Sequence, residues 1–411
     1  MHNKRVTCRL CGSTDVSAVI PLHPILIGEH YTDVKPNQLG VRFPIDIYQC
    51  NNCSAVQTMD DIDNSFLWKD YTYFSSQNRS VKEHFKGFAH RIDSYFKTKG
   101  KVLDIGSNDG TLLTYFRDLG WQVQGIDPAK TVVEEANRQA IPTIHGFFDS
   151  KTAMQLDIAD KYDLITAFNV FAHSSDMQGM LANVRKLLKD SGLFCFEVQY
   201  LGDISEKHIL GTIFHEHMVH YSLHSASIFL EREGLEVFDF ERNNNQNGSI
   251  IFFCKKKNNI TQSIQKKHIK SLKDYEQSIH INTNEWASKF MMRLINDRIS
   301  VSKALKDNHI AKNELAGYGA ARSGPTLAIQ YCLDDFIGDI YDDHPSKCGY
   351  YSPFNGKIVK KSSLIVEEMP KMIVILAYLY YKQIIKDLDD YIQKGGVVLL
   401  LWPEVQVISN R

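Results

Sequence analysis

Two cysteine pairs near the N-terminus have the spacing of metal ligands. Cys8 and Cys11 form one CxxC pair, and Cys50 and Cys53 form a second. Each pair can place two thiolates around one tetrahedral ion, and together they complete the four-sulfur shell of a structural zinc site. Because a closed shell leaves no position for water, we expect a zinc ion that takes no part in chemistry. The alternative is two unrelated pairs of reduced cysteines.

A glycine-bearing turn predicts a nucleoside site. Residues 102–110 read as a strand that runs into a turn, and a helix follows. Gly106 and Gly110 lack the GxGxxG spacing that cradles a pyrophosphate, so a nucleoside without phosphates fits better. A second strand ends about 20 residues later at Asp127, where such folds bind ribose hydroxyls. S-adenosylmethionine satisfies both features; a purely structural turn and an NAD-type site are the alternatives. The predicted cofactor-binding residues here are Asp104, Gly106, Asn108, Gly110 and Asp127.

Several motifs together resemble those of the sugar C-methyltransferases that act on nucleotide-linked keto-deoxysugars. They are the two CxxC pairs, VLDIGSNDGTLL (102–113), HEH (215–217) followed by YSL (221–223), YFSS (73–76), NVFAH (169–173), NGS (247–249), GAAR (319–322) and DDHPSK (342–347). The resemblance covers nearly the whole chain. It implies a zinc-binding N-terminal module, a central methyl-donor domain in which Asn169 is a further cofactor-binding residue, and a C-terminal α/β domain that helps to close over a sugar nucleotide.

Methylation of a sugar carbon needs a carbanion, and a ring carbon becomes acidic enough only beside a ketone. The enzyme must remove the α proton, donate a hydrogen bond to the enolate oxygen, and align the carbon with the sulfonium methyl. We predict that His217 is the base, because imidazole titrates near neutral pH. Glu216 can orient it or act beside it. A metal cluster around these histidines is an alternative, although their spacing is not HExxH.

One residue departs from the resembled family. The family block reads Tyr-His-Glu-His, and its tyrosine, histidine and glutamate are implicated in deprotonation and enolate stabilisation. Phe214 replaces the tyrosine here and cannot donate a hydrogen bond. His173 and Tyr73 match family positions, and we predict His173 first as the oxyanion donor or second acid/base group. The alternative for any one of these histidines is a structural imidazole.

A second glycine turn lies near the C-terminus. In GYGAARS (317–323) the third glycine position holds Arg322, and Asp342 and Asp343 follow about 20 residues later. This spacing imitates a dinucleotide site and makes a redox enzyme a rival. An arginine and a serine at a helix start also suit a diphosphate, and we favour a diphosphate site here. Residues 247–249 are a second candidate segment for substrate binding, and a plain turn is the alternative for them. The predicted substrate-binding residues are His215, Asn247, Ser249, Arg322 and Ser323.

The elements that must position these residues alternate between strands and helices. Short apolar runs at 101–105, 123–126, 162–168 and 193–198 predict a parallel sheet, with helices such as 177–188 between them. A polar segment at 258–308 predicts one or two long helices. A second set of apolar runs lies at 315–319, 337–341, 372–376 and 397–401. The predicted α/β fold thus has a zinc-binding module (1–65), a Rossmann-like methyltransferase domain (66–257), and linker helices with a Rossmann-like α/β domain (258–411).

Composition excludes several classes of function. The 411 residues include 47 Lys+Arg and 48 Asp+Glu, so no excess of positive charge is available for a nucleic-acid backbone. A membrane span needs about 18 consecutive apolar residues, and every apolar stretch in the sequence is much shorter. Because no apolar signal core follows Met1 either, we expect a cytoplasmic protein. No sustained heptad implies an oligomer. An O- or N-methyltransferase acting on a nucleotide sugar and a non-catalytic binding module are the rivals to a C-methyltransferase.

Overall fold

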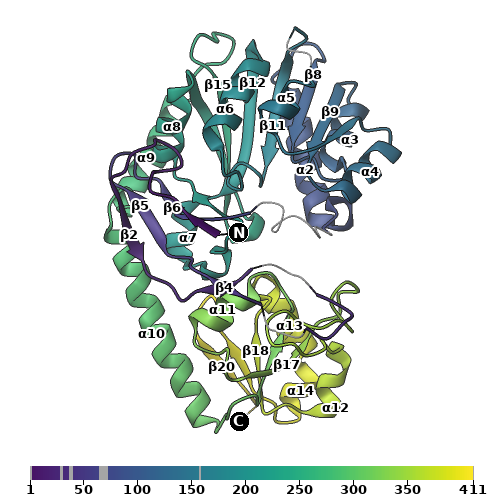
Figure 1. The fold of residues 1–411 in the computed structure, drawn as a ribbon, viewed down its shortest axis with the longest axis vertical. Coiled ribbons are helices and arrows are strands. Elements are labelled where there is room, and N and C mark those ends of the chain that lie inside the picture. Colours follow the sequence, from purple (N-terminus) through teal and green to yellow (C-terminus); the bar gives the residue numbers. More distant parts are fainter. Residues whose placement is uncertain (1, 28–30, 37–39, 64–72, 157–158, 411) are drawn as a thin grey trace.

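The computed structural model describes residues 2–27, 31–36, 40–63, 73–156 and 159–410. The boundary predicted between residues 65 and 66 lies outside these ranges. Figure 1 shows a large sheet with its helices in one lobe, a smaller sheet with its helices in the other, and the N-terminal strands between them. The long helix α10 (Glu285–Asp307) runs along one side and joins the two lobes.

The large lobe is built on a seven-stranded sheet in the order β10-β9-β8-β11-β12-β15-β14. The five strands from β10 to β12 are parallel and β15 runs antiparallel to both of its neighbours. The central strands β8 and β11 are buried along nearly their whole length, as expected where helices cover both faces of a parallel sheet, and the predicted parallel sheet is confirmed. Its strands are β8 (Lys101–Ile105), β9 (Gln122–Asp127), β10 (Thr143–His145), β11 (Tyr162–Phe168), β12 (Leu188–Gln199), β14 (Leu235–Asn243) and β15 (Ser249–Lys256). The accompanying helices are α2 (Arg79–Asp93), α3 (Thr111–Asp118), α4 (Lys130–Arg138), α5 (Ser150–Ala153), α6 (Met177–Leu187), α7 (Leu201–Lys207) and α8 (Leu223–Arg232).

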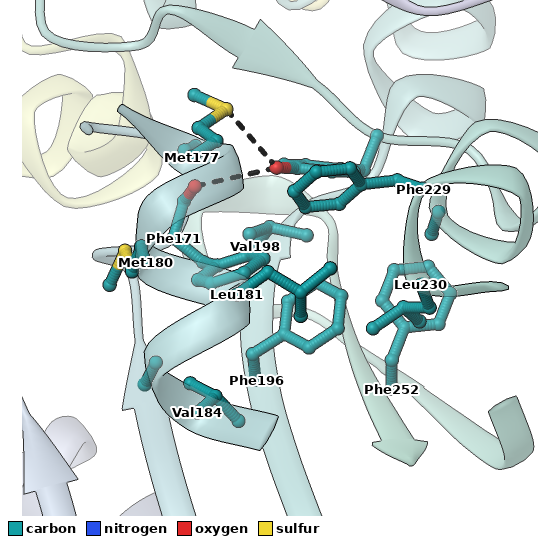
Figure 2. Packing of buried hydrophobic residues seen from close by; sticks show 14 of the residues in the cluster. Phe171, Met177, Met180, Leu181, Val184, Phe196, Val198, Phe229, Leu230 and Phe252 are labelled. Carbon is teal, nitrogen blue, oxygen red and sulfur yellow. Dashed lines mark hydrogen bonds between the residues drawn. The ribbon is translucent and has the colours of Figure 1, made fainter. Parts of the chain in front are cut away.

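An aromatic core fixes the loop that follows β11. Figure 2 shows side chains of α6, β12, β15 and α8 packed around Phe171. The hydroxyl of Tyr221 donates to the Phe171 carbonyl and to Met177 Sδ, both at 3.4 Å. Since Phe171 and Tyr221 are both fully buried, this contact holds residues 171–173 against residue 221. The two chain segments that carry the predicted histidines are thereby joined.

The N-terminal segment forms an antiparallel sheet in the order β13-β6-β5-β2. The strands β2 (Val16–Ile20), β5 (Ile47–Cys50) and β6 (Val56–Thr58) come from this segment, whereas β13 (Val219–His220) comes from the middle of the chain. Two further ribbons pair β1 (His2–Lys4) with β7 (Asp60–Ile62) and β3 (Ile25–Leu26) with β4 (Arg42–Phe43). The N-terminal sheet is therefore completed by a strand beside the predicted catalytic block.

The predicted linker helices are α9 (Lys266–Ser278) and α10, and a five-stranded sheet follows in the order β17-β16-β18-β19-β20. Its strands are β16 (Leu315–Tyr318), β17 (Ile337–Tyr341), β18 (Met372–Ile375), β19 (Val398–Leu400) and β20 (Gln406–Ile408). Its helices are α11 (Gly324–Gln330), α12 (Ile365–Glu368), α13 (Tyr381–Asp387) and α14 (Asp389–Gln393). Among the described residues, every helix is too short or too polar to cross a bilayer.

Candidate active site

The four predicted metal ligands lie together. Their sulfur atoms are all within 4.8 Å of one another, with 3.6 Å between Cys8 and Cys53 and 3.5 Å between Cys11 and Cys50. Zinc–sulfur bonds of about 2.3 Å in a tetrahedron put the sulfurs about 3.8 Å apart, so the cluster fits the ion. The amide of Gln57 donates to Cys8 Sγ at 3.2 Å, which is a contact suited to a thiolate.

This thiol cluster is tied to the predicted catalytic block by β6. Gln57, which contacts Cys8, pairs with Val219 of β13, and Val56 pairs with His220. The next residue, Thr58, donates its backbone N–H to the Met218 carbonyl at 3.0 Å. The backbone of residues 218–220 is thus positioned by the strand that follows the second cysteine pair.

The predicted donor turn lies at the carboxyl ends of β8 and β9. The carboxylate of Asp127 accepts backbone hydrogen bonds from Asn108 at 2.9 Å and Ala129 at 2.8 Å. Gly106 has a φ of +70°, and a Cβ there would lie 2.2 Å from Val170 Cγ2. Only glycine fits this position. The turn therefore packs directly against the loop that begins at Asn169.

The side chain of Asn108 is already engaged. Its Oδ1 accepts from the Ser75 N–H and its Nδ2 donates to the Tyr73 carbonyl, both at 2.9 Å. Asn108 thus fastens the segment that carries Tyr73 to the donor turn. Tyr73 itself is 44% exposed and does not line the histidine pocket described below.

Asp104 is a buried carboxyl beneath the turn, and it predicts a measurable dependence of stability on pH. Burial raises the pKa of Asp104 to about 7. The hydrogen bond that its carboxylate accepts from Thr166 Oγ1 at 2.7 Å lowers the pKa and only partly offsets the effect of burial. The folded chain therefore holds a proton that the unfolded chain releases above about pH 4. The contribution of Asp104 to the free energy of unfolding should therefore fall as pH rises from about 4 to about 7.

We expect Asp104→Asn to remove this pH dependence and to stabilise the protein at pH 8 by a few kcal/mol, on the order of 2–4. Urea unfolding at pH 5 and pH 8 measures both effects. The surface variant Asp160→Asn serves as a control, since Asp160 is exposed. If the free energy of unfolding changes equally with pH in wild type and in Asp104→Asn, Asp104 is ionised in the folded state.

A small pocket brings the predicted histidines together. It is lined by Asn169, Ala172, His173, Val198, Gln199, His217, Val219 and His220. The His173 and His217 rings stack with centroids 5.0 Å apart. The pocket lies where β11 and β12 end, beside the donor turn, and the carboxyl ends of parallel strands are where open α/β sheets bind ligands.

The hydrogen bonds of His217 define its tautomer. Its Nδ1 lies 2.7 Å from the carbonyl oxygen of Thr212. A carbonyl only accepts, so Nδ1 carries the proton and Nε2 of the neutral ring carries the lone pair. Burial, together with the neighbouring His173 and His220, holds the pKa of His217 well below its usual range. The ring is therefore neutral at pH 7 and can accept a proton at Nε2.

The C-terminal domain reaches this site through Arg322. Its Nη1 lies 3.4 Å from Oε1 of Glu216, which is almost fully buried. The guanidinium carbon is also 6.0 Å from the centre of the Phe214 ring, and that ring lies 4.0 Å from the His217 ring. After burial, the charge of Arg322 is the second cause that lowers the pKa of His173, to about 3. A fixed positive charge thus stands beside the histidine pair.

The remaining predicted substrate residues contact other parts of the chain. His215 Nε2 donates to the Pro44 carbonyl at 3.0 Å, and Ser323 Oγ donates to the Leu376 carbonyl at 3.4 Å. Ser249 is fully buried, and its hydroxyl donates to the Asn245 carbonyl at 3.1 Å; the Asn247 carbonyl accepts from Lys207 at 2.7 Å. These four residues do not line the histidine pocket.

Sequence reasoning missed Gln199 and His220 in the pocket and Glu197 beside it. Glu197 accepts from His84 Nε2 at 2.7 Å, and its carbonyl accepts from the Asn169 N–H at 2.9 Å. Glu197 and Gln199 could have been found from their place at the carboxyl end of a predicted strand. The position of His220 follows from its pairing with a strand more than 150 residues earlier, and nothing local in the sequence indicates it.

Comparison with known proteins defines the family. Residues 78–239 match the model of a methyltransferase domain, and residues 244–403 match that of a C-methyltransferase C-terminal domain. The chain is 27% identical to the C-methyltransferase NovU of Streptomyces niveus, over 98% of this chain and 96% of NovU. It is an S-adenosylmethionine-dependent C-methyltransferase. The predicted fold class and the predicted enzyme class are confirmed.

Other similarities to this C-methyltransferase are partial. The ubiquinone biosynthesis O-methyltransferase of Rhodopseudomonas palustris strain TIE-1 aligns with 23% of this chain and 37% of its own length, and the aligned residues are 33% identical. Among solved structures, the PH0226 protein of Pyrococcus horikoshii OT3 aligns with 46% of this C-methyltransferase and 97% of its own chain, at 18% identity and a TM-score of 0.38.

Proposed function

We propose that this C-methyltransferase transfers a methyl group to a ring carbon, C3, of a nucleotide-linked 4-keto-deoxysugar through an enolate. The hydrogen bond from His217 Nδ1 to Thr212 carries this proposal, because it leaves Nε2 as a proton acceptor in the pocket beside Asn169. A base is needed for carbon methylation, since the α proton must leave before the carbon can attack. The family motifs in the sequence support a keto-deoxysugar as acceptor.

The proposed reaction has two steps. His217 Nε2 takes the proton from the carbon next to the ketone, and the electrons of the C–H bond form the enolate. The ring carbon then attacks the methyl group that S-adenosylmethionine supplies, the carbon–sulfur bond breaks toward sulfur, and the ketone reforms. The charge of Arg322, which lowers the pKa of both His173 and His217, also favours the negative enolate.

The C-terminal domain is the proposed site for the sugar's diphosphate. Arg322 and Ser323 lie where the chain enters α11, and a guanidinium recognises phosphate oxygens well. Because Arg322 also contacts Glu216, binding of the diphosphate to Arg322 can affect the residues beside the base. We further propose that the ion held by the four thiols is zinc and that its role is structural.

The test is an assay with labelled S-adenosylmethionine and a panel of thymidine, cytidine and guanosine diphosphate 4-keto-6-deoxysugars. We expect one of them to gain a methyl group on a ring carbon, located by mass spectrometry and NMR. Transfer to a hydroxyl or an amine would contradict carbon chemistry on these sugars. Donor binding without transfer to any of them would contradict the proposed acceptor class.

A further inference from the structure

His220 is a buried imidazole to which the proposed mechanism gives no role. Its side chain is 3% exposed and lines the same pocket as His173 and His217. Within the described part of the chain, its Nε2 has no hydrogen-bond partner. A buried polar atom left in this state costs about 1–3 kcal/mol, and folded proteins keep few of them. A partner that arrives with the substrate accounts for this atom.

The fold holds the His220 ring at a defined place in the pocket. On one side its backbone pairs with Val56 of β6, and on the other Tyr221 bridges to Tyr200. The ring stands edge-on to His217, with centroids 6.4 Å apart and planes at 88°. One substrate group held between the two rings can therefore contact both.

The role of hydrogen-bond donor to the substrate is left open by His217 and Phe214, which neighbour His220. His217 already donates through Nδ1 and presents an acceptor at Nε2. Phe214, whose ring packs on His217, has no donor. Burial lowers the pKa of His220 to about 4, so its ring is neutral at pH 7. A neutral imidazole always carries one N–H, and such a ring can polarise a carbonyl oxygen.

We propose that His220 is a catalytic residue that donates a hydrogen bond to the oxygen of the acceptor ketone as it becomes an enolate. This inference rests on the proposed enolate chemistry, and it gives His220 the oxyanion role that the sequence predicted first for His173. As His217 Nε2 takes the α proton, the π electrons of the C=O bond move to oxygen, where the His220 N–H meets the new charge. When the ring carbon takes the methyl group, these electrons return to C=O, and His220 keeps its proton throughout.

The experiment measures deuterium incorporation next to the ketone for the same panel of nucleoside diphosphate 4-keto-6-deoxysugars, without methyl donor, so that it reports enolate formation alone. Three variants of the full chain are compared with wild type. His220→Phe and His220→Met lack a donor, and methionine fits irregular apolar space if phenylalanine does not. His220→Gln keeps an N–H donor of similar reach.

We expect exchange to fall by about 10²–10³-fold in the Phe and Met variants, as for loss of one oxyanion donor, and by less than about tenfold in the Gln variant. Because Nε2 makes no hydrogen bond to any residue that the structure describes, His220→Met should keep the wild-type melting temperature or exceed it, which a structural histidine would not allow. The Kd for S-adenosylmethionine should be unchanged.

Exchange in His220→Met within threefold of wild type would overturn the role of His220. Loss in His220→Gln as large as in His220→Met, or a lower melting temperature in His220→Met, would make His220 a structural residue and overturn it equally. A wild type that exchanges no deuterium on any sugar of the panel contradicts instead the proposed function, so the two failures are distinguishable.

Discussion

His217→Asn is expected to lower methyl transfer by about 10³-fold or more, within the range for loss of a general base. The asparagine amide can still donate to the Thr212 carbonyl, which receives the His217 Nδ1 proton at 2.7 Å in wild type. The variant therefore keeps the anchoring contact and loses only the acceptor at Nε2. Single-turnover transfer with labelled S-adenosylmethionine and the accepted sugar nucleotide measures the loss.

Donor binding provides the control for this variant. The turn at Gly106 and Asp127 does not depend on the His217 side chain, so calorimetry should give a Kd for S-adenosylmethionine within twofold of wild type. His268→Asn, on α9 and half exposed, should change neither quantity. Methyl transfer at the wild-type rate in His217→Asn would exclude His217 as the base.

The pH dependence should also differ from that of an ordinary histidine. Burial holds the pKa of His217 well below its usual range, so Nε2 stays unprotonated as pH falls from 8 to 6. The rate constant for transfer should therefore not decline near pH 6.5, where an exposed histidine base gains a proton. A decline with a midpoint near 6.5, absent from the donor-binding curve, would place His217 in a more solvated setting.

Two strands that position the site, β8 and β11, could be predicted from the sequence because they are mostly apolar and buried on both faces. Residues 101–105 and 162–168 have the bounds of β8 and β11. The predicted donor turn follows for the same reason, since a glycine turn at the end of such a strand is a local feature. Glycine is required at position 106 because the side chain of Val170 occupies the space that a Cβ atom would need.

The pairing between distant segments could not be predicted. β13 has only two residues and carries no periodic pattern of its own, yet it completes the N-terminal sheet and aims His220 at the pocket. His217 and His173 were each singled out by residue type, but their stacking depends on the loop that Tyr221 anchors. The site depends on contacts between distant segments, from 50 residues apart for Tyr221 and Phe171 to more than 150 for β13 and β6, and the order of residues alone does not show them.

The link between the thiol cluster and the pocket gives the second large effect. Cys50→Ser is expected to lose the bound metal and to lower methyl transfer by about 10²-fold or more, the scale of losing a catalytic group. Cys50 ends β5, which pairs with β6, and β6 in turn pairs with β13. Structural zinc supplies about 10–16 kcal/mol of folding free energy in small zinc domains, so this sheet should lose its order without the ion.

Among the described residues of the N-terminal segment, none forms a strand of the seven-stranded sheet. The Cys50→Ser variant should therefore bind S-adenosylmethionine within threefold of wild type while His217 and His220 lose their backbone support. Mass spectrometry of the metal should find one zinc per chain in wild type and in Cys332→Ser, whose thiol is exposed. If Cys50→Ser holds no zinc and still methylates at the wild-type rate, the N-terminal sheet does not position the pocket. If donor binding is lost together with transfer, the ion supports the whole fold, because the damage then extends beyond the residues that β6 holds.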